Sequence, residues 1–187
     1  MRLFHVSDFS GITRFIPQSS QGEIPFVWAI DEDHLPNYLF PRQCPRVSYL
    51  SSNGHRIIYV EESWIDRIRE SFIWIYQMPV EGFRLFDPTA GYFVSSNTIK
   101  PMSCRPINDL VAALLEYKAE LFVVPSLWPI FDQVTSTQSE FSCIRMRNAQ
   151  PRRIADNSLQ TRANKMPQAT GIRPCLDIER SAKNELH

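Results

Sequence analysis

The sequence has little cysteine and little glycine, and each shortage excludes a class of chemistry. Its four cysteines lie far apart, without the two-residue spacing that zinc sites and redox motifs use. Only six glycines occur in 187 residues, and neither a Walker loop nor a Gly-rich dinucleotide fingerprint is present. The His-Glu-x-x-His and Gly-x-Ser-x-Gly motifs are missing as well. We therefore expect no metal site, no classical nucleotide hydrolysis and no Rossmann chemistry.

Long apolar runs and an excess of one charge are also missing. The apolar runs are far shorter than the roughly 20 residues that a membrane-spanning helix needs, and no signal-peptide pattern follows Met1. The 20 basic and 20 acidic residues give a formal net charge of zero, which argues against a strongly basic nucleic-acid binder. We expect a cytoplasmic protein with reduced thiols that binds neither membranes nor nucleic acids. The sequence does not predict an oligomeric state.

Aromatic residues are absent from the last part of the chain. All 22 Phe, Tyr and Trp residues lie at or before Phe141. Residues 151–187 carry seven basic and four acidic residues, a net charge of +3, so the preceding part has a net charge of −3. Because aromatic side chains bury the most apolar area, this last part lacks material for a core of its own. We expect one compact domain over residues 1–147 and a flexible or loosely docked tail over 148–187.

Short apolar runs of strand length outnumber the helical patterns. We expect strands over residues 2–6, 26–30, 47–50, 57–60, 72–76, 83–86, 92–94, 121–124 and 141–146. Asn53 and Gly54 stand between two of these runs and predict a hairpin, because both residue types accept a positive φ.

Helical spacing predicts three helices and a further short one. We expect a helix over residues 64–72 capped by Ser63, one capped by Asn108 or Asp109, one capped by Ser126, and a short helix over 35–39. Strands are more numerous than helices and several neighbours are joined by hairpins. The predicted class is α+β, with a mainly antiparallel or mixed sheet and three or four helices.

The first candidate binding residues are His5 and Ser7, at the end of the first strand. An imidazole there can hydrogen-bond a ligand hydroxyl, and Ser7 adds a second polar contact. The structural alternative is a histidine whose hydrogen bonds go to backbone groups.

The second candidate is the pair Arg42 and Arg46, which flank Cys44 in a segment that two prolines keep from being helical. Guanidinium groups suit a phosphate or a carboxylate, and their charge would lower the pKa of the thiol. A rigid turn with solvated arginines and an inert buried thiol is the alternative, and we favour it for Cys44. A thiol enzyme would need a histidine beside Cys44 in space.

Three further segments carry polar or aromatic groups that suit a pocket. His34, Asn37 and Tyr38 could line a pocket rim, although solvated loop residues are the simpler interpretation. Tyr92, next to Gly91, could stack on a ring or pack in the core. Glu140, the only acid in a polar stretch, could act as a base or bind a ribose, or could lie at a solvated helix end.

Six segments together resemble a family of uncharacterised bacterial proteins found in Bacillus-type organisms. They are Leu3–Ser7, Val27–Asp31, His34–Leu39, Pro41–Val47, Ala90–Ser95 and Pro125–Trp128. They occur in the same order and with similar spacing over residues 1–147. The family is a domain of unknown function, so the resemblance implies a boundary rather than an activity.

The chain is also remotely similar to the ADP-ribosyltransferase-like fold. His5 matches a histidine of that group that contacts the NAD ribose, and Tyr92–Ser95 followed by Pro101 is similar to a later strand. The resemblance implies NAD or another nucleotide-like ligand, with His5 and Ser7 on a ribose and Arg42 and Arg46 on phosphates.

The catalytic glutamate of that group would fall at Ala90 or Gly91, and neither residue is acidic. The alternative hypothesis is therefore a non-catalytic binding or regulatory domain.

Overall fold

The chain is described by a computed structural model over residues 1–19, 24–138 and 140–152. These residues form two compact units, each built from two separate stretches of chain. Unit 1 contains Met1–Arg42 and Arg67–Tyr117, and unit 2 contains Gln43–Asp66 and the described residues from Lys118 onward. The single domain over 1–147 stays a prediction, and most of the predicted tail over 148–187 lies outside the described residues.

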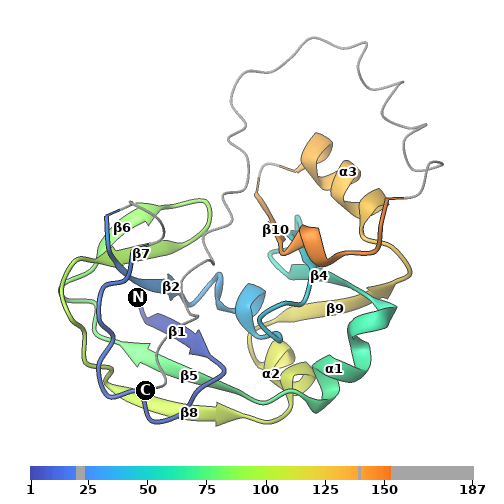
Figure 1. Cartoon of the computed structure of the whole chain (residues 1–187). Coiled ribbons are helices and arrows are strands. Elements are labelled where there is room, and N and C mark those ends of the chain that lie inside the picture. Colours follow the sequence, from blue (N-terminus) through green and yellow to red (C-terminus); the bar gives the residue numbers. More distant parts are fainter. Residues whose placement is uncertain (20–23, 139, 153–187) are drawn as a thin grey trace. The chain divides into compact units, whose positions relative to one another are not determined.

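Unit 1 is built on a six-stranded sheet in which every pair of neighbours is antiparallel (Figure 1). The strand order is β6-β7-β2-β1-β5-β8. The strands are β1 (Leu3–Ser7), β2 (Val27–Asp31), β5 (Ile73–Met78), β6 (Arg84–Asp87), β7 (Tyr92–Ser95) and β8 (Ser103–Ile107). The unit also contains the short 3-10 helix η1 (Leu35–Tyr38) and helix α2 (Leu110–Glu116).

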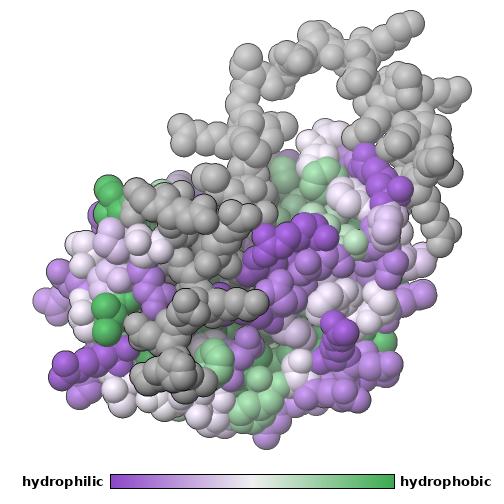
Figure 2. All heavy atoms as spheres, viewed as in Figure 1, coloured by the Kyte–Doolittle hydropathy of each residue, from purple (hydrophilic) through white to green (hydrophobic). Residues whose placement is uncertain are grey.

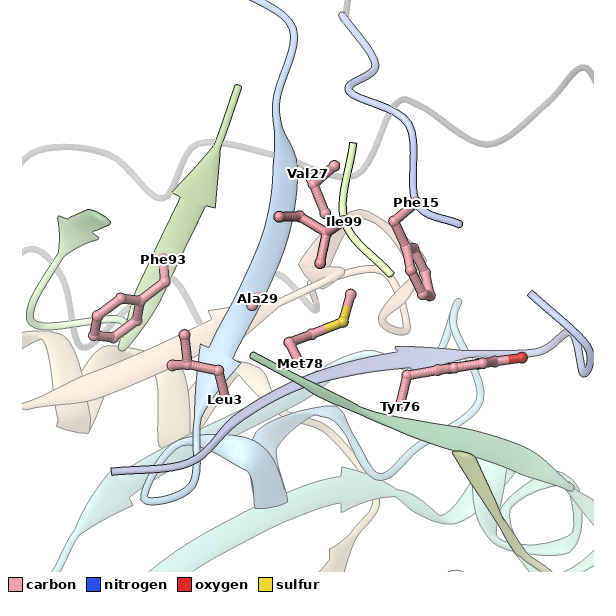
Figure 3. Close-up of a cluster of buried hydrophobic side chains, with 8 residues drawn as sticks. All are labelled: Leu3, Phe15, Val27, Ala29, Tyr76, Met78, Phe93 and Ile99. Carbon is pink, nitrogen blue, oxygen red and sulfur yellow. The ribbon is translucent and has the colours of Figure 1, made fainter. Parts of the chain in front are cut away.

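One face of this sheet carries a buried apolar cluster. Because side chains alternate along a strand, every second residue of the central strands points to this face. The cluster comprises Leu3, Phe15, Val27, Ala29, Tyr76, Met78, Phe93 and Ile99 (Figure 3). Phe15 and Ile99 lie outside the strands and are joined by two backbone hydrogen bonds of 2.8 and 2.9 Å. Burying one of the Val, Leu, Ile, Met or Phe side chains of this cluster stabilises the fold by about 1.5–3 kcal/mol.

Unit 2 is built on a four-stranded sheet in the order β10-β3-β4-β9. Its strands are β3 (Arg46–Leu50), β4 (Arg56–Glu61), β9 (Ala119–Val124) and β10 (Phe141–Ile144). All neighbours are antiparallel except β4 and β9, which are parallel. Helix α3 (Trp128–Thr137) packs through Leu127 and Val134 against Val47 and Cys143, so one face of the sheet is covered by α3.

The α+β class is confirmed, and so are several local predictions. Strands β3 and β4 pair as an antiparallel hairpin, with Gly54 at a φ of +81° in its turn. Asp109 caps α2, and its carboxylate accepts a hydrogen bond of 2.9 Å from the amide of Ala112.

The first predicted helix differs from the structure in extent. It consists of the 3-10 turn η2 (Glu62–Trp64) followed by α1 (Ile65–Glu70), and Ser63 lies inside η2 instead of capping it. The helix ends before Phe72 because Ile73 begins β5, so the strand overrides the helical spacing. The third predicted helix begins one residue beyond its expected cap: Leu127 is the N-cap of α3, while the Ser126 hydroxyl accepts a 3.4 Å hydrogen bond from the Trp128 amide. The last 3-10 turn, η3 (Met146–Asn148), was not predicted.

Candidate functional site

His5 lies where β1 parts from β2. The β1–β2 ladder ends at the pair Phe4 and Ile30, whereas the ladder between β1 and β5 continues to Ser7. In place of the missing ladder contact, the His5 ring nitrogen Nδ1 lies 2.9 Å from the Trp28 carbonyl oxygen. A carbonyl oxygen accepts hydrogen bonds only, so Nδ1 carries the proton and Nε2 is the unprotonated nitrogen when the ring is neutral.

The surroundings of His5 favour the neutral ring. Burial lowers its pKa, the bond to the Trp28 carbonyl raises it, and the positive charge of Arg42 lowers it, so that the pKa lies below the usual 6.5. The ring also packs on Phe15, with ring centroids 4.7 Å apart. Near neutral pH, His5 therefore offers Nε2 as a hydrogen-bond acceptor, and that atom makes no hydrogen bond to the described part of the chain.

Ser7 and Arg42 belong to the same unit as His5. Ser7 is two residues further along β1, so strand alternation places it on the same face of the sheet. Its hydroxyl oxygen accepts a 3.1 Å hydrogen bond from the Phe9 amide, which leaves the hydroxyl hydrogen to donate. Arg42 is near enough for its charge to act on the His5 ring. Unit 1 thus holds an acceptor and a donor of the predicted set on one face of the sheet, and a cation whose charge reaches the acceptor.

Tyr92 lies on the opposite face of that sheet. Residues paired across antiparallel strands share a face, and Tyr92 pairs with Ile30, which in turn pairs with Phe4. Successive side chains along a strand point to opposite faces, so Phe4 and His5 lie on different faces of the sheet. Tyr92 shares the face of Phe4 and therefore points away from the His5 face. The sequence could not show this, because the face of Tyr92 depends on its register with β2 and β1.

Around Tyr92, aromatic rings pack edge to face. Its ring centroid is 5.7 Å from that of Trp28, which is 5.0 Å from that of Phe86. The hydroxyl groups of Tyr92 and Tyr38 form a hydrogen bond. Tyr92 is partly buried, so packing among these aromatic rings accounts for it without a ligand.

Arg46 and Cys44 lie in unit 2, and both are buried. The Arg46 guanidinium donates a 2.7 Å hydrogen bond from Nη1 to the Cys44 carbonyl oxygen, which braces the turn before β3. Burial raises the pKa of the Cys44 thiol to about 12; the charge of Arg46 lowers it and that of Glu61 raises it. The predicted effect of the arginine is present but is smaller than the effect of burial, and the thiol stays protonated and unreactive.

His34 and Asn37, which the simpler interpretation placed in solvent, are instead buried in unit 1. The Asp31 carboxylate accepts a 2.9 Å hydrogen bond from the His34 amide, and the His34 Nδ1 lies 2.7 Å from the same oxygen. Gly91 packs directly on this pair, at a φ of +68°. The spacing of Asp31 and His34, three residues apart after a strand, is the signal that could have predicted the pair.

Two carboxylates of unit 2 also have structural partners. Glu140 lies between α3 and β10, where its side chain is 34% exposed and forms a 2.8 Å ion pair with Arg56. Glu61, which no sequence pattern indicated, is 1% exposed. Its oxygens accept hydrogen bonds from the backbone amides of Leu127, at 3.2 Å, and Gln150, at 2.9 and 3.1 Å. No local pattern marks Glu61, because its donors lie 66 and 89 residues further along the chain.

Beside Glu61, unit 2 has an open pocket of about 400 Å³. Its lining residues are Glu62, Ser63, Pro125, Ser126, Gln150 and Pro151. The described residues contain no group of three or more His, Cys, Asp or Glu side chains arranged to hold a metal ion. Nor does any helix among them combine the length and apolar character needed to cross a membrane.

Comparison with known proteins identifies a family. A family model described as a family of unknown function, DUF6886, matches residues 4–149. No curated protein and no solved structure matches the chain.

Proposed function

Since the chain belongs to the DUF6886 family of unknown function, its function must be argued from its own side chains, and we propose that unit 1 binds a nucleotide-like ligand such as NAD. The observation that supports this most is the His5 ring, which its bond to Trp28 holds in one orientation and one tautomer. A neutral imidazole with an available Nε2 accepts a hydrogen bond from a sugar hydroxyl.

The other two groups extend the same site. The Ser7 hydroxyl lies on the His5 face and donates to a second ribose oxygen, while the Arg42 guanidinium binds the phosphates through its paired N–H groups. Arg46 and Tyr92 are not part of this site, because Arg46 already holds the Cys44 carbonyl in unit 2 and Tyr92 points to the opposite face.

Isothermal titration calorimetry with NAD, ADP-ribose and free nucleotides tests this proposal. We expect His5→Ala and Arg42→Ala each to weaken binding by roughly tenfold or more, which corresponds to about 1.4 kcal/mol for a lost charge-assisted or buried hydrogen bond. His55→Ala is the matched control, because His55 is exposed in unit 2 and its side chain pairs with Glu120, outside the proposed site. Absence of heat and of any thermal shift with all of these ligands would refute the proposal.

The second candidate function is a binding or regulatory domain without catalysis. Two observations favour it: Ala90 and Gly91 stand where the resemblance to ADP-ribosyltransferases would place the catalytic acid, and the Cys44 thiol is buried with a pKa of about 12. It predicts that the protein never consumes NAD, even when NAD binds. Chromatography detects nicotinamide released from NAD, with and without nucleophilic acceptors. Any such release would contradict this second candidate function.

A further inference from the structure

The edge strands of the two sheets differ in how they are protected against pairing with another strand. A free edge presents a row of unpaired backbone N–H and C=O groups, and natural proteins block such edges with proline, charge, bulges or short length. In the described residues, the six-stranded sheet ends at β6 and β8, and the four-stranded sheet ends at β10 and β9.

Three of these edges carry such protection. Strand β6 has an irregular register between Leu85 and Asp87 and an exposed Arg84. Strand β8 contains Pro106, which has no N–H to donate, next to the exposed Arg105. Strand β10 is only four residues long.

Strand β9 has none of these devices. Its six residues, Ala119–Val124, pair with β4 in continuous register without a bulge. Two successive large apolar residues, Phe122 and Val123, are 43% and 44% exposed and point to opposite faces of the sheet. Its one charge, Glu120, is paired with His55 at 2.9 Å. Hydrophobic residues form separate patches among hydrophilic ones over the face drawn in Figure 2. On β9, the exposed apolar side chains of Phe122 and Val123 are combined with an edge that pairs with no other strand of the described residues.

The aromatic rings across this sheet lead towards the same edge. Tyr49, Tyr59 and Phe122 come from β3, β4 and β9, and their rings are stacked with centroids 6.4 and 5.4 Å apart. Each ring in the row covers part of the next, and the outermost ring, Phe122, has a neighbour in the row on one side only.

We propose that β9 pairs antiparallel with β9 of a second copy of this chain, about a two-fold axis at Phe122. In this register the two Phe122 rings face each other and continue the aromatic row, while Leu121 of each copy lies opposite Val123 of the other. Every exposed apolar residue of β9 thereby gains an apolar neighbour, which stabilises cross-strand pairs.

Two features argue for a second copy over a different partner. A two-fold contact uses the same edge on both chains and then leaves no β9 edge free, so assembly stops at two. In the register about Phe122 the strand is also complementary to itself, because Glu120, the one charged residue of β9, lies opposite Val124 of the other copy and no like charges are opposed. The site is distinct from the proposed ligand site, which lies in unit 1.

Size-exclusion chromatography with light scattering, over a hundredfold range of concentration, tests the surface on the full chain. We expect the wild type to have twice the chain mass, and Val123→Lys to weaken association at least about tenfold by placing a charge opposite an apolar residue. Leu85→Lys is the matched control, because Leu85 is 51% exposed on the protected strand β6. A wild-type monomer at all concentrations, or a dimer that Val123→Lys leaves intact, would overturn the proposal. A circular-dichroism melt shows whether Val123→Lys remains folded.

Disulfide trapping tests the register without adding a charge. With Cys104 and Cys175 replaced by serine, Phe122→Cys should form a cross-linked dimer under mild oxidation, because directly opposed residues have Cβ atoms about 4.5–5.5 Å apart. Val123→Cys, which faces Leu121 of the other copy, should cross-link far less. Equal or stronger cross-linking through Val123→Cys would refute the two-fold axis at Phe122.

Discussion

Replacing Gly91 with alanine tests how tightly the Asp31–His34 pair is packed. A Cβ atom at residue 91 would lie 2.6 Å from Cγ of His34 and 2.7 Å from an Asp31 carboxylate oxygen, closer than van der Waals contact. The backbone φ of +68° is also unfavourable for any residue with a Cβ. Two separate costs therefore add at this position.

The size of each cost can be estimated. The left-handed conformation costs alanine about 1–2 kcal/mol, and forcing a methyl group into a packed site costs about 1–3 kcal/mol. We expect Gly91→Ala to lower the free energy of unfolding by about 2–5 kcal/mol. For a chain of this size each kcal/mol lowers Tm by about 2–4 °C.

Gly54→Ala separates the two costs. Gly54 has a similar φ of +81°, but a Cβ there meets no atom within 4 Å. Gly54→Ala should therefore lower the free energy of unfolding only by the cost of the left-handed backbone conformation, about 1–2 kcal/mol. Urea unfolding followed by tryptophan fluorescence measures both variants. If the two lose the same stability to within about 0.5 kcal/mol, the reasoning about packing on His34 is wrong.

Three further predictions concern buried titratable groups. Iodoacetamide at pH 8 should modify the exposed Cys104 and leave Cys44 intact until the protein is unfolded, because a thiol with a pKa near 12 carries almost no thiolate; peptide mass spectrometry checks this. Folding lowers the pKa of His5, so the neutral ring's contribution to stability is present above about pH 6.5 and is lost as the pH falls below 6.5. His5→Asn has no such titrating group, so between pH 6.5 and 5 its Tm in thermal melts should fall less than that of the wild type. Glu61→Gln should lower the free energy of unfolding by about 2–3 kcal/mol, because an amide oxygen replaces a carboxylate that accepts backbone hydrogen bonds, whereas the exposed Glu62→Gln should change it by less than about 0.5 kcal/mol in urea titrations.

The local elements were largely predictable from residue spacing. The strands at Leu3–Ser7 and Val27–Asp31, the Asn53-Gly54 hairpin and the Asp109 cap all have a signal in the residue types of a few neighbouring positions. Residue spacing predicted a helix that reaches Phe72, but β5 begins at Ile73 and its pairing with β1 decides the boundary.

The candidate site was predictable only in part. The two alternatives for His5 are not exclusive in the structure: one ring nitrogen is bound to backbone, as the structural interpretation required, and the other remains available to the proposed ligand. Arg42 acts on the same ring, but Arg46, only four residues away, lies in the other compact unit. The division into two interleaved units has no local signal.

By itself, the sequence determined the α+β class, most strand positions and the chemical types at the candidate site, because periodicity and capping act over a few residues. The tertiary structure decided the rest. It placed Tyr92 opposite His5 through the register of three strands, buried His34 under Gly91, and supplied Glu61 with donors from 66 and 89 residues away. Such contacts depend on which distant strands pair and in what register. The register of a strand is set by which of its faces is buried in the core, and short stretches of sequence do not specify this.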